Sequence, residues 1–144
     1  MKDEDRADAL NTTKPTPDLL LPGVPAAVDR LSAIRRRLAE WATAAGLPRD
    51  QVQDLTLATY EAMSNVIDHA YPHSSGMFDL HAEHQVDRLT VTIVDHGRWK
   101  PADVPTTGLR GRGLLLMKGL SSEFELIHQS VGTLVRMSWP LPTR

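Results

Sequence analysis

The chain contains no cysteine among its 144 residues, which excludes disulfide bonds, thiolate catalysis and cysteine-ligated zinc. It has no apolar run close to the roughly 20 residues of a membrane-spanning helix, and residues 1–8 are acidic rather than signal-like. Neither sign of charge dominates, since 16 Lys and Arg residues stand against 18 Asp and Glu residues. We therefore expect a cytoplasmic protein that makes no general electrostatic contact with nucleic acid or membrane.

Apolar residues make up 41% of the chain and charged residues 24%, which is enough apolar material for one globular domain with its own core. Residues 1–17 differ from the rest, because they are polar and end in Lys14-Pro-Thr-Pro17. Such a segment lacks the apolar surface that would offset the entropy lost on ordering it. We expect residues 1–17 to be a disordered tail and residues 18–144 to form the domain.

Helical spacing of apolar residues predicts two helices after a short strand at residues 19–21. The first begins near Pro25, which suits a first helical turn, and ends at Gly46. The second begins at Pro48 and ends before Pro72, which cannot continue a helix. Their apolar positions are Val28, Leu31, Ile34, Leu38, Trp41 and Ala45 in the first helix, and Val52, Leu55, Ala58, Ala62 and Val66 in the second.

Alternating apolar residues further along the chain predict strands. A hairpin turns near residues 85–87, a short helix covers residues 114–120, and a final strand pair turns at residues 131–132. The hairpin's inward positions are Phe78, Leu80 and Ala82, then Leu89, Val91 and Ile93. This order predicts an α/β two-layer sandwich whose mostly antiparallel sheet is covered on one face by helices.

Three polar side chains recur every four residues in the second predicted helix: Glu61, Asn65 and His69 share one of its faces. An apolar stripe suited to core packing runs beside them through Ala58, Ala62, Val66 and Ala70. Asn65 could offer magnesium a carbonyl oxygen, and Glu61 could orient or deprotonate an attacking hydroxyl. Taken alone, Glu61 is better interpreted as a solvated side chain, and the alternative for Asn65 is an ordinary Asn on a helix face.

Two glycine motifs accompany this polar face. Asp95-His-Gly97 ends a predicted strand, where a carboxylate can accept a hydrogen bond from an exocyclic amino group and a glycine lets a ring approach the backbone. Gly111-Arg-Gly113 precedes Leu114, so a bare backbone at a helix start could hold phosphates. Each motif alone is typical of an ordinary turn. Together with the polar helix face they indicate a nucleotide pocket.

A connection without periodicity runs from residue 96 to residue 112 and contains three glycines and two prolines. Its four cations, Arg98, Lys100, Arg110 and Arg112, stand against the single acid Asp103. Such a loop suits a lid that closes over phosphates, and the alternative is a solvated surface loop. The basic run at residues 35–37 is interpreted as the solvated face of the first helix. The alternative is a basic patch that contacts a partner protein.

The histidines suggest an alternative metal site, because His69, His73, His81 and His84 follow each other closely and imidazole is a common zinc ligand. No cysteine joins them, Pro72 interrupts the helix between the first two, and His81 and His84 alternate to opposite faces of a strand. This alternative is therefore disfavoured. It predicts stoichiometric zinc in the purified protein.

In chain order, four segments resemble the nucleotide-binding boxes of the histidine-kinase-like ATPases. They are Glu61-x3-Asn65-x3-His69-Ala-Tyr, Asp95-x-Gly97, Gly111-x-Gly113-Leu114 and Gly132-Thr133. The resemblance covers about residues 19–140, and the Asn-x3-His-Ala-Tyr ending is most similar to anti-sigma serine kinases of the RsbW and SpoIIAB type. One departure is that the superfamily's Asp-x-Gly-x-Gly is shortened here to Asp95-His-Gly97-Arg-Trp99.

This resemblance implies the Bergerat fold with ATP and Mg²⁺ as cofactors. It implies Glu61 as the general base, Asn65 as the magnesium ligand, Asp95 and Thr133 at adenine, and Arg110 or Arg112 at the terminal phosphate. The remaining pocket residues that it implies are His69, Gly97, Gly111, Gly113 and Leu114.

The resemblance also implies a function in regulating transcription, typically in a stress response. The protein would phosphorylate a serine of an anti-anti-sigma protein of the STAS type and otherwise hold a sigma factor inactive, often as a homodimer. An alternative of a different class is a catalytically silent ATP-binding module that acts only by occupying its partner. Phosphate on the partner's serine after incubation with Mg-ATP discriminates between the two.

Overall fold

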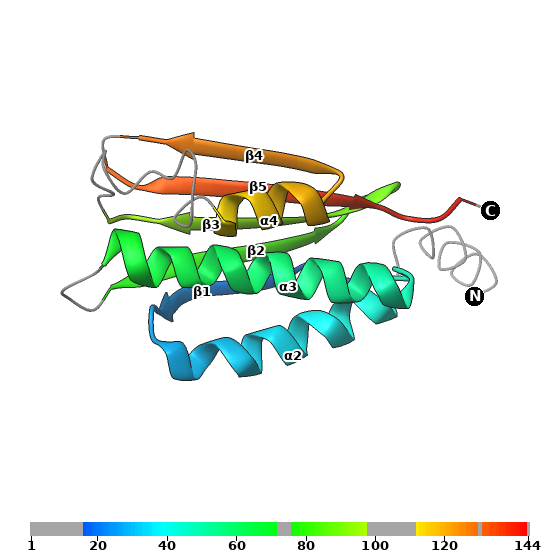
Figure 1. The fold of residues 1–144 in the computed structure, drawn as a ribbon. Coiled ribbons are helices and arrows are strands. Elements are labelled where there is room, and N and C mark those ends of the chain that lie inside the picture. Colours follow the sequence, from blue (N-terminus) through cyan, green and yellow to red (C-terminus); the bar gives the residue numbers. More distant parts are fainter. Residues whose placement is uncertain (1–15, 72–75, 98–111, 130, 144) are drawn as a thin grey trace.

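A computed structural model describes residues 16–71, 76–97, 112–129 and 131–143. Within these residues one sheet is covered on one face by a layer of helices (Figure 1). The elements in chain order are β1 (Leu19–Pro25), α2 (Val28–Ala44), α3 (Arg49–Asn65), η1 (Val66–Ala70), β2 (Met77–His84), β3 (Arg88–Asp95), α4 (Arg112–Leu120), β4 (Glu123–His128) and β5 (Thr133–Pro140). The predicted two-layer architecture is therefore confirmed.

The sheet has the strand order β1-β2-β3-β5-β4, and all four neighbouring pairs are antiparallel. Because β3 and β5 run in opposite directions, the last residue of one lies beside the first residue of the other. Asp95, which ends β3, is directly opposite Thr133, which begins β5. The topology thus brings two predicted site residues together at one end of the sheet.

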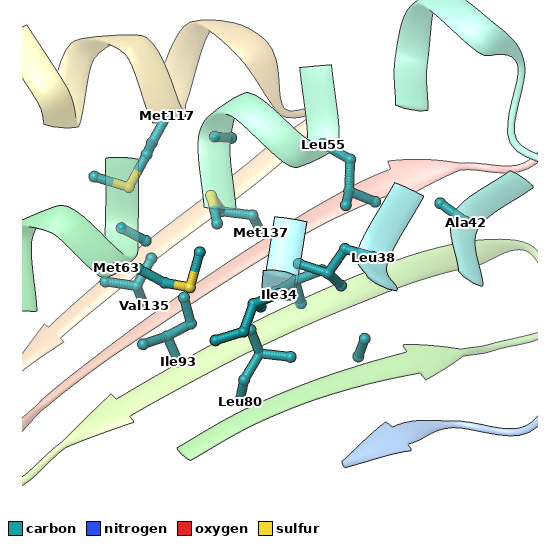
Figure 2. Close-up of a cluster of buried hydrophobic side chains, with 14 of the residues drawn as sticks. Ile34, Leu38, Ala42, Leu55, Met63, Leu80, Ile93, Met117, Val135 and Met137 are labelled. Atoms are coloured by element: carbon teal, nitrogen blue, oxygen red, sulfur yellow. The ribbon is translucent and has the colours of Figure 1, made fainter. Parts of the chain in front are cut away.

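The core lies between the helices and the sheet, where side chains from both layers meet (Figure 2). The six inward positions predicted for the β2–β3 hairpin are all buried. The predicted small-residue stripe of the second helix, Ala58, Ala62, Val66 and Ala70, is buried as well. Small side chains let a helix approach the sheet closely, and this stripe therefore sets the height of α3 and η1 above the strands.

The start of the first helix differs from the prediction. Pro25 is the last residue of β1 and pairs with Met77, and α2 begins at Val28 after Ala27 in an extended conformation. A strand at the edge of a sheet tolerates proline, because no neighbour needs its missing N–H. Gly23, with φ +62°, lies in the register shift that separates the two halves of β1. Val28 is 66% exposed, so it is not the core position that helical spacing predicted.

The end of the second helix also differs. The α-helix ends at Asn65 and continues as the π-helical turn η1, in which the Tyr71 N–H donates to the Val66 carbonyl five residues earlier, at 3.3 Å. A π-helical turn is wider than an α-helical turn and is frequent at functional sites. Pro72, which was expected to stop the helix, lies outside the described residues.

The residues that precede β1 are tied to α2. The Pro17 carbonyl accepts a 2.8 Å hydrogen bond from Trp41 Nε1, and Thr16 Oγ1 donates to the Ala44 carbonyl at 3.3 Å. The remainder of the expected tail, residues 1–15, lies outside the described residues. Of the helices that are described, none has the length and apolar character needed to cross a membrane.

Candidate functional site

The polar face of α3 meets the beginning of α4. Glu61 and Asn65 are half-buried on α3, and Gly113 lies in the first turn of α4. A Cβ atom on Gly113 would lie 3.4 Å from both polar atoms of the Asn65 carboxamide and 3.5 Å from Glu61 Oε1. Three residues that the sequence separates by up to 52 positions are thus immediate neighbours.

This meeting point combines groups of complementary chemistry. The first backbone N–H groups of a helix have no partner inside the helix and carry partial positive charge, which favours phosphate oxygens. Beside them, the Asn65 carboxamide offers an oxygen of the kind that magnesium accepts, and Glu61 offers a carboxylate. Since glycine leaves the α4 backbone bare at this point, the described residues fit the phosphate end of a magnesium nucleotide.

A second group of predicted site residues gathers at the end of β3. Asp95 is 2% exposed, and its Oδ1 accepts the Gly97 N–H at 3.1 Å. Thr133, directly opposite, is 3% exposed, and its Oγ1 lies 3.0 Å from His128 Nδ1. A buried carboxylate and a buried hydroxyl side by side suit recognition of a polar group on a base.

Two glycines hold this second group against the helix layer. A Cβ atom on Gly97 would collide with the Ala70 carbonyl at the end of η1, and a Cβ atom on Gly132 would collide with the Asp95 carbonyl. The Gly132 N–H also donates to the Gly97 carbonyl at 2.9 Å, and Gly132 has φ +103°, which favours glycine. Close backbone contact therefore connects the Asp95 segment to the helix that carries Asn65.

Tyr71 is a positioning residue whose role was not predicted from the sequence. Its hydroxyl accepts the His96 N–H at 3.1 Å and donates to the Met77 carbonyl at 2.9 Å. It thereby links the end of η1 to the residue after Asp95 and to the start of β2. The signal was present in the sequence, because Tyr71 is the last residue of the His-Ala-Tyr ending, but a pattern does not show where a hydroxyl reaches.

We predict that Tyr71→Phe lowers the free energy of unfolding by about 1–2 kcal/mol, because two solvent-exposed hydrogen bonds are lost while the ring stays. Urea denaturation measures this change. Tyr60→Phe is the matched control, since the contact described for Tyr60 is made by its ring, 5.5 Å from the Arg35 guanidinium. Equal stability of Tyr71→Phe and the wild type would show that the hydroxyl bonds do not hold this junction together.

The other predicted site residues fall into two sets. His69 lies half-buried in η1, and Leu114 is partly buried and packs against the core from α4. Arg110 and Gly111 lie outside the described residues, as does the side chain of Arg112, whose backbone begins α4. The predicted lid loop, residues 98–111, is likewise outside them.

The fold and the gathered polar residues together define the class of the protein. An antiparallel five-stranded sheet with helices on one face, a polar helix face beside the start of a second helix, and a buried Asp at a strand end are the features of the Bergerat fold of histidine-kinase-like ATPases. Sequence comparison agrees, because residues 24–139 match the family described as the histidine kinase-like ATPase domain. The chain belongs to this family.

Two of the relatives that match this chain are both named serine-protein kinase RsbW. The chain is 27% identical over 119 residues to the serine-protein kinase RsbW of Bacillus cereus strain AH187. The aligned region covers 73% of this chain and 74% of that protein. It is 34% identical over 84 residues to the serine-protein kinase RsbW of Staphylococcus epidermidis, covering 57% of this chain and 53% of that protein. The resemblance to RsbW-type kinases is therefore confirmed.

Solved structures bear out the fold. The RsbU and RsbW domains of Rv1364c from Mycobacterium tuberculosis superpose with a TM-score of 0.69 at 22% identity, covering 90% of this chain. The chain spans only 34% of that larger protein. The histidine kinase domain of a blue-light activated kinase from Erythrobacter litoralis gives a TM-score of 0.57 at 22% identity, covering 77% of this chain and 61% of the other.

Proposed function

We propose that the protein is a magnesium- and ATP-dependent serine kinase that acts on an anti-anti-sigma protein of the STAS type. When that substrate is unavailable, it sequesters a sigma factor, so that transcription in a stress response is regulated by partner switching. The observation that carries this proposal is the convergence of Glu61 and Asn65 on the bare backbone of Gly113. Relatives named serine-protein kinase, matched over 73% of the chain, support the reaction type.

The proposed division of labour starts at the nucleotide. Asp95 accepts a hydrogen bond from the adenine amino group, with Thr133 beside it, and the backbone from Gly111 to Gly113 holds the phosphates. The Asn65 carbonyl oxygen is the protein ligand of magnesium, which commonly takes only one or two such ligands. When bound, ATP would supply the transferable phosphoryl group, and the magnesium ion would offset the negative charge of the phosphate oxygens.

The proposed chemical step needs few protein groups, because phosphoryl transfer depends mainly on positioning and charge stabilisation. Glu61 takes the proton of the substrate serine hydroxyl as the serine oxygen bonds to the terminal phosphorus and the bond to the leaving diphosphate breaks. Glu61 lies one helical turn before Asn65 and, like Asn65, close to Gly113, which supports the proposal that the base acts beside the magnesium ligand. Arg110 or Arg112 is proposed to stabilise charge at the terminal phosphate.

The cellular location, oligomeric state and partners are proposed from the same family resemblance. The protein is expected to act in the cytoplasm, as a homodimer, with protein partners rather than nucleic acid or membrane. Its formal net charge of −2 is consistent with this choice, because it provides no general attraction for phosphate backbones or anionic lipid.

Phosphotransfer to a protein substrate tests the proposal. The purified protein is incubated with Mg-ATP and an anti-anti-sigma protein from the same organism, and mass spectrometry locates phosphate on the substrate. The expected result is a single phosphoserine that does not form without the protein. A complex that forms while the substrate stays unmodified would overturn the kinase assignment and favour the silent binding module.

A further inference from the structure

A second group of metal-ligating side chains lies away from the nucleotide site, where β1 begins beside the end of β2. Leu19 pairs with Ala82, so Asp18, the residue before Leu19, lies next to Glu83. His81 and Glu83 are two residues apart on β2 and therefore project from the same face of the sheet. One ligand atom from each of Asp18, His81 and Glu83 lies within 4.8 Å of the other two.

The position of Asp18 is set by the main chain of β2. Its Oδ1 accepts the backbone N–H of His84 at 3.1 Å, and its Oδ2 lies 3.3 Å from His81 Nε2. One carboxylate oxygen thus orients the group while the other points to the imidazole. A ligand held in this way loses little conformational entropy when an ion arrives.

The group is open to solvent. Alternate residues of β2, including Leu80 and Ala82, are buried against the helices, so His81 and Glu83 project from the opposite face of the sheet. The side chains of His81 and Asp18 are 40% and 30% exposed. An ion can therefore reach the three donors without any opening of the core.

We propose that Asp18, His81 and Glu83 form a zinc site, with water completing the coordination. A nitrogen donor with two carboxylate oxygens suits zinc, whereas magnesium and calcium prefer oxygen ligands alone. Zinc bonds of about 2.0–2.2 Å in tetrahedral geometry place donors about 3.4 Å apart. The Asp18 and His81 atoms already have nearly this spacing at 3.3 Å, and Glu83 completes the set by rotating its side chain.

This site is not the histidine cluster considered from the sequence. His84 is 3% exposed and faces the core, so it lies on the other side of the sheet from His81, as strand alternation predicted. The ligand that joins His81 instead is Asp18, which lies 63 positions away in the chain. Bound zinc would fasten the start of the edge strand β1 to its only described neighbour in the sheet, β2.

The test is a calorimetric titration of the nucleotide-free full chain with zinc chloride, in parallel with thermal unfolding. We expect saturable binding of one zinc per chain and a rise in the melting temperature, since zinc binds the folded state. His81→Gln should weaken zinc binding at least ~10-fold, in line with the loss of a zinc-site residue. Glu83→Gln should weaken it in the same direction.

His96→Gln is the matched control. His96 Nε2 lies 3.7 Å from Asp79 Oδ2, which makes a second pair of histidine and carboxylate, but in the described part of the chain no third ligand joins that pair. Its zinc affinity should equal that of the wild type. The proposal is overturned if the wild type shows no saturable zinc binding, if both ligand variants bind like the wild type, or if His96→Gln loses as much affinity as His81→Gln.

Because the ligand variants change partly exposed side chains outside the core, zinc-free samples should melt at nearly the wild-type temperature, and this comparison verifies that they are folded. The site shares no residue with the nucleotide site. Failure of zinc binding would therefore leave the proposed kinase function untouched, and loss of kinase activity would leave the zinc site standing.

Discussion

Glu61→Gln is expected to lower the rate of serine phosphorylation by ~10²–10⁴-fold, the usual contribution of a general base. Glutamine has nearly the same size and keeps a hydrogen-bonding oxygen, but it cannot take the proton of the serine hydroxyl. Because Glu61 is half-buried on α3 and is not one of the buried core residues, the fold should persist. Single-turnover transfer of phosphate to the partner protein measures the effect.

Measurement of nucleotide binding distinguishes a role of Glu61 as general base from a structural role. Glu61 lies beside Gly113, so a structural role of its carboxylate would show as weaker binding at the proposed phosphate end of the site. We expect the affinity for Mg-ATP to stay within about twofold of the wild type, since Asn65 and the α4 backbone are unchanged. Glu125→Gln is the control, because Glu125 lies on β4, away from Gly113, and forms a surface ion pair with Arg136 at 3.0 Å. Transfer by Glu61→Gln at the wild-type rate would show that another group is the base.

Asp95→Asn is expected to weaken ATP binding by ~10–100-fold, which corresponds to the loss of a hydrogen bond to a charged, buried acceptor. Asn keeps an oxygen that can accept the Gly97 N–H, now at 3.1 Å from Asp95 Oδ1, so the turn after β3 should survive. That oxygen is then engaged, and the amide nitrogen would face the adenine amino group donor to donor. The thermal shift induced by Mg-ATP should fall accordingly.

Two comparisons make this test more specific: GTP in place of ATP, and substitution of a second aspartate, Asp87. GTP should give little shift with the wild type, because its ring presents an oxygen where adenine presents an amino group. Asp87→Asn, in the exposed turn between β2 and β3, should keep the full shift with ATP. If Asp95→Asn responds to ATP like the wild type, Asp95 does not read the base, and the proposed orientation of the nucleotide is wrong.

The elements of this fold were largely predictable, because each is specified by a local pattern. Alternation placed Phe78 and Ile93 on the inner face of the hairpin, and both are buried. Four-residue spacing placed Ala58 and Ala62 on one helix stripe, and both lie in the core. The helix and strand periods are properties of the backbone alone, so burial of one face follows once the apolar residues repeat at that period.

Local patterns failed where a distant partner sets the conformation. Pro25 belongs to β1 because Met77 pairs with it, and no feature of the neighbouring sequence reveals that pairing. The π-helical turn at Val66–Ala70 was not predicted, because a single turn with five-residue instead of four-residue hydrogen bonds leaves almost no trace in the spacing of apolar residues. Gly97 was expected to admit a ligand ring, but its missing Cβ also makes room for the Ala70 carbonyl.

The residue types of the candidate nucleotide site and the layers of the fold were therefore determined by the sequence itself, since periodicity and chemical type are local properties. Their meeting was decided in three dimensions. Only chain packing could bring Gly113 onto Asn65, place Thr133 opposite Asp95, and set Asp18 against His81. Contacts between residues far apart in the chain depend on how the layers bury their apolar faces together, and no single segment contains that information.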